Sequence, residues 1–503
     1  MDSDDAAVEL RTLLTEAAHV FSKYVQQSQQ PGAHVSGRIQ GGLADAAHPE
    51  HDARMFPNAG VGSRVWDDVR DVCAGAANTW SSAFLYKLYA APAPMGIVAE
   101  TLLAVLNNNA HVTRAAPSGA AIERMVARKL AQLLGFSSSA DGLTFPGGSY
   151  ANLHALMTAR NTRFPDVRTR GMRNVRGAVF TSAHAHYSID KAAVAAGFGL
   201  DCVVHVPTDA VGRMDVHKLR ELMLDSRAQG VEPFFVNATM GTTVLGACDP
   251  IAEISNVCRE FGAWLHVDGS WGGPHALFGD DPAFSVHNTH IDSFVVNPHK
   301  LLGVPLQCSF LIMRQGLNVM RRALGLGATY LFHDSEQEKC DVDRADLPCD
   351  VGDATLGCGR RPDAIKFWLM WRYYGTQYFI NRVAQARNTS LRLAELVRTR
   401  TSLLGRWVLV TEPASTCVCF WFVPCALNEK RSEWGGATRR MCTHINDGGS
   451  VLLDYATVDV FDSTSTCTLP EFFRIPINNP SVSNTTLEAV LSAIENSAAE
   501  LYS

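Results

Sequence analysis

The chain reads Ala263-Trp-Leu-His-Val-Asp268 and, one helix-length segment later, Ser293-Phe-Val-Val-Asn-Pro-His-Lys300. Each stretch contains a short apolar run of the length of a buried strand and ends in an ionisable residue. In open α/β sheets, ligands bind beyond the carboxyl ends of the strands. An aspartate and a lysine at two such ends therefore predict a sheet with a binding site at its edge.

Similar apolar runs recur on both sides of these two stretches, with helix-length segments such as 214–228 and 250–261 between several of them. This alternation predicts a largely parallel sheet covered by helices, with strands buried on both faces. After residue 364, helical signals lead into strand-like runs. The expected strands of the sheet are residues 178–182, 203–206, 233–239, 263–268, 293–297 and 310–313.

The pattern predicts three parts: an N-terminal helical arm over residues 1–95, a large α/β domain over 96–363 and a small α+β domain over 364–503. Of the 503 residues, 47% are apolar and 19% are charged, as in a soluble globular protein. A net charge of −6 favours neither a nucleic-acid nor a membrane partner. The acidic start and scattered cysteines without CxxC pairs indicate a cytoplasmic protein with reduced thiols and no metal site.

Lys300 and Asp268 are residue types that hold pyridoxal 5'-phosphate (PLP). A lysine amine forms a Schiff base with a carbonyl cofactor when its pKa is depressed. A buried carboxylate keeps the proton on a pyridine nitrogen. Each residue also has an ordinary interpretation: an isolated Lys300 is more often a loop residue, and Asp268 could cap the next element.

Two further groups complete a cofactor site at the same edge. His186 follows the predicted strand 178–182 and could stack on a flat ring, although a turn histidine is the commoner outcome. Gly148 and Ser149 precede a helical stretch, where free backbone N–H groups bind anions. His299 could contact a phosphate or belong to a loop. Together these residues supply an amine, a ring-nitrogen partner, a stacking group and an anion site.

Several longer segments match one known family in order along the chain. They are Phe235-Val-Asn-Ala-Thr-Met-Gly-Thr-Thr-Val244, Trp264-Leu-His-Val-Asp268, Trp271-Gly-Gly273, Asn297-Pro-His-Lys300, Leu306-Gln-Cys-Ser309, Cys358-Gly-Arg360 and Lys366-Phe-Trp-Leu-Met-Trp371. From about Leu85 to the C-terminus, the chain resembles the group II PLP-dependent decarboxylases, the branch with glutamate, cysteine-sulfinate and aspartate decarboxylases.

The resemblance implies PLP fold type I, with a large, mostly parallel seven-stranded sheet carrying helices on both faces. It implies an enzyme that releases CO2 from the α-carbon of a small, acidic amino acid and gives the amine. It also implies a homodimer with the active site at the interface.

At the matching positions, the resemblance implies a role for each candidate residue. Lys300 is the Schiff-base lysine, Asp268 the pyridinium partner and His186 the ring-stacking histidine. The expected phosphate and cofactor contacts are Gly148, Ser149, Thr243 and His299.

Two more residues enter through the resemblance alone. Arg474 matches the arginine that holds the substrate α-carboxylate, although without the resemblance it reads as a surface arginine. Tyr330 matches the tyrosine that protonates the substrate α-carbon after CO2 leaves, and the alternative is an aromatic side chain packed under a loop.

The sequence departs from the family mainly around the expected substrate pocket. The apolar, proline-rich segment 90–96 and Thr113 stand where relatives carry other residues, while the cofactor set is intact. The chemistry is therefore expected to be retained, and the departures count against glutamate as the substrate more than they count against decarboxylation. Alternatives are decarboxylation-dependent oxidation, a condensation in specialised metabolism, or a catalytically silent dimeric scaffold.

Overall fold

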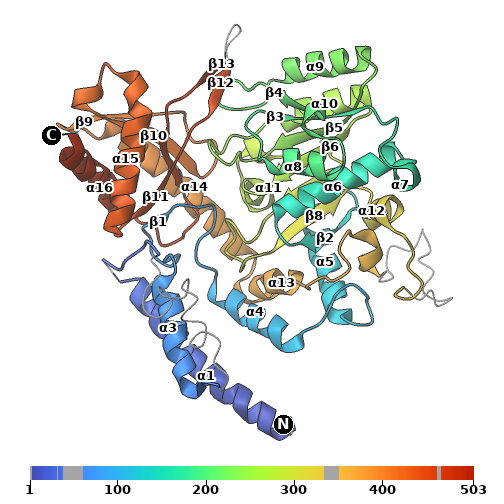
Figure 1. Cartoon of the computed structure of the whole chain (residues 1–503), viewed down its shortest axis with the longest axis horizontal. Helices are drawn as coiled ribbons and strands as arrows, with labels where there is room; N and C mark the ends of the chain where they lie inside the picture. The colour runs from blue at the N-terminus through green and yellow to red at the C-terminus, as the bar shows by residue number, and fades with distance from the viewer. Residues whose placement is uncertain (1–2, 31, 38–59, 333–349, 462–465, 503) are drawn as a thin grey trace, which may run out of the picture.

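The large sheet has seven strands in the order β2-β8-β7-β6-β5-β3-β4 (Figure 1). The structure is a computed structural model that describes residues 3–30, 32–37, 60–332, 350–461 and 466–502. Neighbouring strands from β4 to β7 are parallel, whereas β8 is antiparallel to both β7 and β2. The strands are β2 (Asp141–Phe145), β3 (Gly177–Ser182), β4 (Val203–Val206), β5 (Glu232–Thr239), β6 (Trp264–Gly269), β7 (Ser293–Val296) and β8 (Ser309–Met313).

Helices cover both faces of this sheet, as predicted. Alternate side chains of one strand pack on opposite sides, because Val179 of β3 joins the cluster with α6 and α8, while Phe180 joins the cluster with α9 and α10. The α/β fold expected from the sequence is therefore confirmed. The helices around the sheet are α5 (Pro117–Leu133), α6 (Gly148–Arg163), α7 (Val167–Arg170), α8 (Ser188–Ala195), α9 (Val216–Ala228), α10 (Ile251–Phe261), α11 (Gly273–Phe278) and α12 (Leu317–Leu324).

A second sheet of five strands, in the order β1-β11-β14-β10-β9, lies in the C-terminal part of the molecule. Its outer strand β1 (Phe84–Leu85) comes from the N-terminal segment and pairs in parallel with β11 (Leu452–Ala456). The other strands are β9 (Gly405–Leu409), β10 (Cys417–Pro424) and β14 (Phe472–Pro476), and β12 (Asp459–Phe461) and β13 (Thr466–Thr468) form a separate ribbon. The helices of this part are α14 (Thr376–Thr399), α15 (Trp434–Gly448) and α16 (Asn484–Tyr502).

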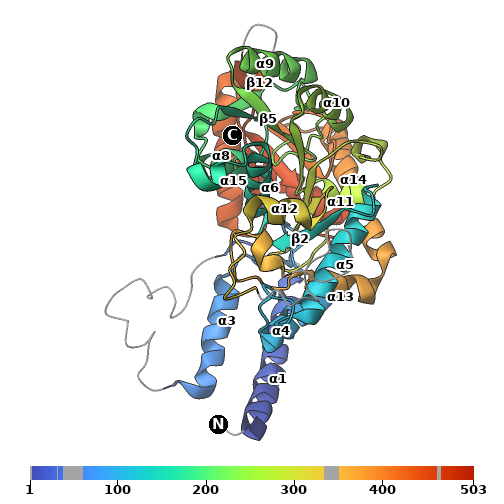
Figure 2. The same ribbon diagram turned by 90° about the vertical axis from the view of Figure 1, so that its right-hand side faces the viewer.

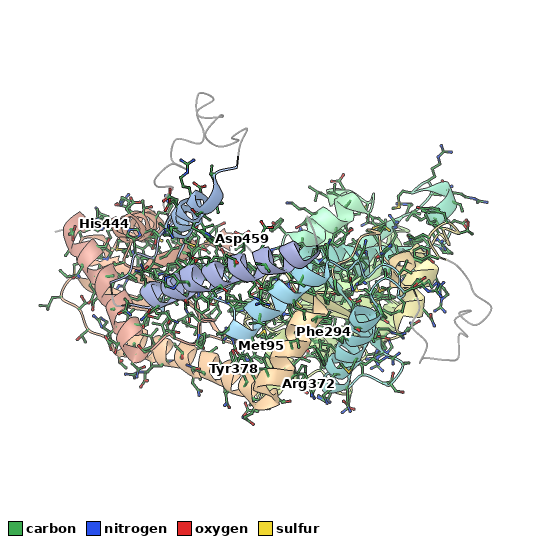
Figure 3. The ribbon with its side chains drawn as sticks, turned by 90° about the horizontal axis from the view of Figure 1, so that it is seen from below. Met95, Phe294, Arg372, Tyr378, His444 and Asp459 are labelled. Atoms are coloured by element: carbon green, nitrogen blue, oxygen red, sulfur yellow. The ribbon has the colours of Figure 1, made fainter. Side chains whose placement is uncertain are left out.

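The N-terminal helices α1 (Ser3–Ser28) and α3 (Val65–Gly75) extend away from the two sheets (Figure 2). They are followed by α4 (Pro94–Leu106), which packs on α13 (Ala364–Tyr374). At this junction the Met95 backbone N–H donates to the Tyr374 hydroxyl at 3.1 Å, and Met95 and Tyr378 lie on the underside of the molecule (Figure 3). The three-part division with boundaries at residues 95 and 363 stays a prediction. Among the described residues, no helix has both the length and the apolar character required to cross a bilayer.

Candidate active site

A cavity of about 200 Å³ opens at the carboxyl ends of β5, β6 and β7. It brings together seven candidates from five separate segments of the chain: Gly148, Ser149, His186, Thr243, Asp268, His299 and Lys300. The other lining residues are Gly147, Asn152, Thr239, Gly241, Ser270, Trp271, Asn297 and Gln307.

Lys300 lies in the turn that follows β7, where its backbone N–H donates to the Asn297 carbonyl at 3.0 Å. Burial lowers the pKa of the Lys300 amine below its usual value, and the nearby charge of Arg474 lowers it further, while Asp268 opposes both. A lowered pKa leaves a larger fraction of the amine unprotonated and nucleophilic at neutral pH.

Asp268, the next-to-last residue of β6, is an ionised carboxylate inside the protein. Burial alone would raise the pKa of Asp268, but hydrogen bonding from Ser270, the charge of Lys300 and hydrogen bonding from Asn152 together lower it below its usual value. The Ser270 backbone N–H donates to Oδ1 at 3.0 Å and Asn152 Nδ2 donates to Oδ2 at 2.8 Å. A carboxylate held in this state can keep a proton on a neighbouring ring nitrogen.

His266 extends this network behind the carboxylate. Burial lowers the pKa of His266 to about 4, so its ring is neutral at physiological pH. Its Nε2 lies 3.0 Å from Asn152 Oδ1, and its Nδ1 lies 2.8 Å from Ser293 Oγ. With the Asn152 oxygen accepting from His266, the Asn152 amide group is oriented to donate to Asp268.

The start of α6 forms a cradle in which a side chain at residue 148 has no room. Gly147 has a φ of +99°, and a Cβ atom at Gly148 would lie 2.5 Å from Ser270 Oγ and 2.8 Å from Asn297 Nδ2. The helix begins here, so its first backbone N–H groups lack intrahelical acceptors. An anionic group such as a phosphate fits this position.

His186 and His299 line the same cavity from two different loops. Ser188 N donates to His186 Nδ1 at 3.2 Å, and burial lowers the pKa of the His186 ring. His299 Nδ1 lies 2.7 Å from the Cys308 carbonyl oxygen, which sets the orientation of that ring, and burial lowers its pKa to about 4. Both histidines therefore meet a ligand as neutral rings.

Arg474, from β14, lies next to the cavity rather than in its wall. Its Nη1 donates to the Thr243 carbonyl at 2.9 Å, and its Nη2 donates to Asp454 Oδ2 at 2.6 Å and to the Tyr86 carbonyl at 3.2 Å. Its buried Nε has no acceptor among the described residues. A buried guanidinium N–H without an acceptor is suited to take a ligand carboxylate.

Tyr330 is not brought to this cavity. Its side chain is 83% exposed, and it is absent from the residues that line the cavity. Its expected role as a proton donor stays a prediction.

The sequence had assigned no role to five polar lining residues: Asn152, Thr239, Ser270, Asn297 and Gln307. Thr239 Oγ1 and Asn297 Oδ1 are buried and have no partner among the described residues. Thr239 and Asn297 lie at strand ends, like Asp268, and Asn152 lies one helical turn after Gly148. Those two patterns are the sequence signals that could have identified Thr239, Asn297 and Asn152, whereas Ser270 and Gln307 lie outside the predicted strands and show neither pattern.

The unpartnered polar atoms and the glycine cradle fit a polar, phosphorylated cofactor, and the amine and the carboxylate fit its carbonyl and ring nitrogen. This fold and this set of groups define a PLP-dependent enzyme of fold type I.

The comparisons with known proteins identify the family. Residues 50–423 match the model of the pyridoxal-dependent decarboxylase conserved domain, and the chain belongs to this family. It is similar to the L-aspartate decarboxylase dtxS4 of Metarhizium robertsii, at 39% identity over 82% of this chain and 78% of the relative. It is also similar to human cysteine sulfinic acid decarboxylase, at 33% identity over 96% of this chain and 95% of the relative.

The crystal structure of mouse CSAD covers 98% of this chain and 99% of its own, with a TM-score of 0.83 and 30% identity. The expected family and PLP fold type I are thus confirmed. The protein is a PLP-dependent carboxy-lyase that acts on an amino acid.

The Asn152 hydrogen bond can be tested through cofactor affinity. We expect Asn152→Ala to weaken PLP binding about tenfold, because the ionised Asp268 loses one buried hydrogen bond. Titration of the apoenzyme with PLP, followed by absorbance, measures this change.

Asn161→Ala is the matched control, because Asn161 lies in the same helix and donates to the Ala323 carbonyl at 2.8 Å, outside the cavity. It should lower stability and leave PLP affinity unchanged. Equal losses of affinity in the two variants would show that Asn152 acts only through the packing of α6.

Proposed function

We propose that the enzyme removes the α-carboxyl group of a small amino acid with an acidic side chain and releases the amine. The candidates are aspartate, glutamate and cysteine sulfinate. Two similar proteins carry names that specify aspartate and cysteine sulfinate as substrates. The acidic side chain rests on these two names, and the observation that carries the binding of the α-carboxylate is Arg474, a buried cation next to Lys300 with an unsatisfied Nε–H.

In this proposal the cavity residues divide into two groups. Lys300 links to the cofactor through its amine, Asp268 keeps the ring nitrogen protonated, and His186 lies against the ring. The phosphate group and the cofactor atoms next to it are bound by Gly148, Ser149, Thr243 and His299. When bound, PLP supplies an electron-withdrawing ring that accepts the electron pair of the bond to the departing carboxyl group.

Arg474 orients the substrate in this arrangement. Its Nη1 and Nη2 are held by Thr243, Asp454 and Tyr86, so the guanidinium cannot rotate freely. The Nε edge then receives the α-carboxylate in one orientation. Fixing the breaking bond in this way is the positioning contribution of the protein to the rate.

We further propose a cytoplasmic homodimer in which Tyr330 serves the cavity of the partner. The exposure of Tyr330 on its own subunit supports this arrangement. Apolar side chains at the surface of α1 and α4, such as Leu13, Phe21, Val98 and Val105, support an extensive interface. The absence of disulfides among the described cysteines fits a reducing compartment.

A screen for CO2 release tests the substrate class. Aspartate, glutamate, cysteine sulfinate and the aromatic amino acids are compared as substrates of the PLP-loaded enzyme. We expect kcat/KM for at least one acidic substrate to exceed that for every aromatic one by about 100-fold or more, because a site that binds an acidic side chain through polar groups leaves those groups unpaired when an aromatic side chain enters. A preference for an aromatic amino acid would contradict the proposal.

A further inference from the structure

Two buried cysteines of β10 lie behind the wall of the cavity. Cys417 and Cys419 are two positions apart in this strand, so their side chains project from the same face of the sheet. Their Sγ atoms lie 3.0 Å and 3.3 Å from the same oxygen atom, the carbonyl oxygen of Val244. Both side chains are free thiols, and the two sulfur atoms therefore converge on one point inside the protein.

The pair of thiols is connected to the cavity through the loop that follows β5. Val244 comes directly after Thr243, which lines the cavity and whose carbonyl accepts from Arg474 Nη1 at 2.9 Å. Cys419 stands directly opposite Arg474 in the antiparallel pairing of β10 with β14, an arrangement that places two Cβ atoms about 4.5–5.5 Å apart. Thr243 and Val244 are only half-buried, which leaves a path for a small ion from the cavity to the thiols.

The charges around the two thiols favour an anionic group. Asp454 stands opposite Arg474 on the other side of β14, and its Oδ2 accepts from Arg474 Nη2 at 2.6 Å and from Lys87 Nζ at 3.0 Å. Two cations and one carboxylate give this row of side chains a net positive charge. The hydrogen bond from Cys419 lowers the pKa of Cys417 below its usual value, and the charge of Arg474 adds to this effect. A thiolate at Cys417 is therefore stabilised.

The number of sulfur ligands decides which kind of metal ion fits. Thiolates are soft ligands that select Cu(I) and zinc, and zinc in structural sites takes four ligands. Across the described part of the chain, no group of three or more His, Cys, Asp or Glu side chains is placed to hold a metal ion. The pair therefore suits a soft monovalent ion that two sulfur atoms can bind, rather than zinc.

We propose that Cys417 and Cys419 form a binding site for Cu(I), and that the occupied site weakens the binding of carboxylate ligands by Arg474. On binding, two S–H bonds break, two S–Cu bonds form and two protons leave, with no change of oxidation state. Cu(I) held by two thiolates carries one negative charge, which complements the net positive charge of the row. Arg474 then faces a permanent anion on its own sheet. The effect on Arg474 rests on the proposed function, whereas the binding of Cu(I) does not.

Competition with a chelator tests the metal site. The PLP-loaded enzyme is titrated with Cu(I) in the absence of dioxygen against bathocuproine disulfonate, and the ions that each chain retains are counted. We expect Cys417→Ser and Cys419→Ser each to weaken the retention of one Cu(I) ion by about 10²- to 10⁴-fold, because the second sulfur atom acts as an intramolecular ligand. Serine keeps a hydrogen-bond donor for the Val244 carbonyl and removes only the soft ligand.

Cys258→Ser is the matched control, because Cys258 is a cysteine of α10 that is buried in the core to the same extent as Cys419. It should leave the retention of Cu(I) unchanged. Equal retention by the unaltered enzyme and all three variants would overturn the proposal. An equal loss in all three variants would overturn it as well, because the loss would then reflect any buried cysteine.

Calorimetry with butanoate, a monocarboxylate, tests the coupling to Arg474. We expect equimolar Cu(I) to weaken butanoate binding about tenfold in the unaltered PLP-loaded enzyme and to have no effect in Cys417→Ser, because the new anion offsets part of the guanidinium charge. Butanoate affinity that does not change when the ion is retained would refute the coupling. Failure of the enzyme to release CO2 from any acidic amino acid would refute the proposed function instead, and the count of retained Cu(I) ions would still decide the metal site.

Discussion

Replacing Lys300 with alanine is expected to abolish CO2 release. The variant loses the amine that holds the cofactor, so we expect turnover to fall by about 10⁴-fold or more. The visible absorption band of lysine-bound PLP should disappear at the same time. Trapping of released CO2 and an absorption spectrum of the PLP-loaded protein measure the two effects.

Lys218→Ala is the control for this substitution. Lys218 lies on the exposed surface of α9, where its Nζ donates to Glu221 at 2.7 Å, and its loss should leave both turnover and spectrum unchanged. The assignment of Lys300 would be wrong if Lys300→Ala kept full turnover.

Tyr330→Phe is expected to change the product rather than simply slow the reaction. The substitution removes the hydroxyl that is expected to deliver a proton to the α-carbon, and general acids of this kind contribute about 10²- to 10⁴-fold to the rate. The electron pair left at that carbon is then exposed to dioxygen, so amine formation should fall and aldehyde with hydrogen peroxide should increase. Separate assays of amine, aldehyde and peroxide measure the partition, and unchanged amine formation would refute the role.

Mixed dimers test whether Tyr330 acts on the partner's cavity. Neither Lys300→Ala nor Tyr330→Phe should form the amine efficiently alone. In a heterodimer, the subunit that keeps Lys300 receives the intact Tyr330 of the other subunit. Random reassociation should then restore amine formation at about a quarter of all sites, because half of the dimers are mixed and each has one complete site. No recovery in dimers shown to be mixed would mean that Tyr330 serves its own subunit.

The strands of the large sheet were largely predictable from the sequence, with one exception. The run from Pro233 to Thr239 is almost continuously apolar because both faces of β5 are buried, and that pattern is local. In contrast, β2 reads Asp-Gly-Leu-Thr-Phe and was not predicted. Its buried Asp141 accepts from Arg124 at 2.9 Å, and the Thr144 backbone donates to Glu123 at 2.7 Å. Polar residues that are buried through tertiary partners carry no local strand signal.

The candidate site shows the same division between local and long-range information. Lys300 and Asp268 lie at the ends of apolar strands, so their place at one sheet edge follows from the sequence, and the structure brings them together. The contribution of Asn152 depends on His266 and Asp268 meeting it from another segment. The surroundings of Arg474 depend on Asp454 and on the carbonyls of Tyr86 and Thr243, which no spacing rule connects.

The pairing of β1 with β11 also orders events during synthesis of the chain. Lys87 and Asp454 are separated by 367 positions, and a ribosome adding about 5 to 20 residues per second needs roughly 20 to 70 seconds to cover that interval. Asp268 of β6 and Lys300 in the turn after β7 both emerge well before Asp454 does. A nascent chain can therefore assemble the cofactor-binding edge while the segment around Phe84 still lacks its neighbour. The end of the site nearest Arg474 is the last to be completed, and chains released before β14 emerges can never acquire it.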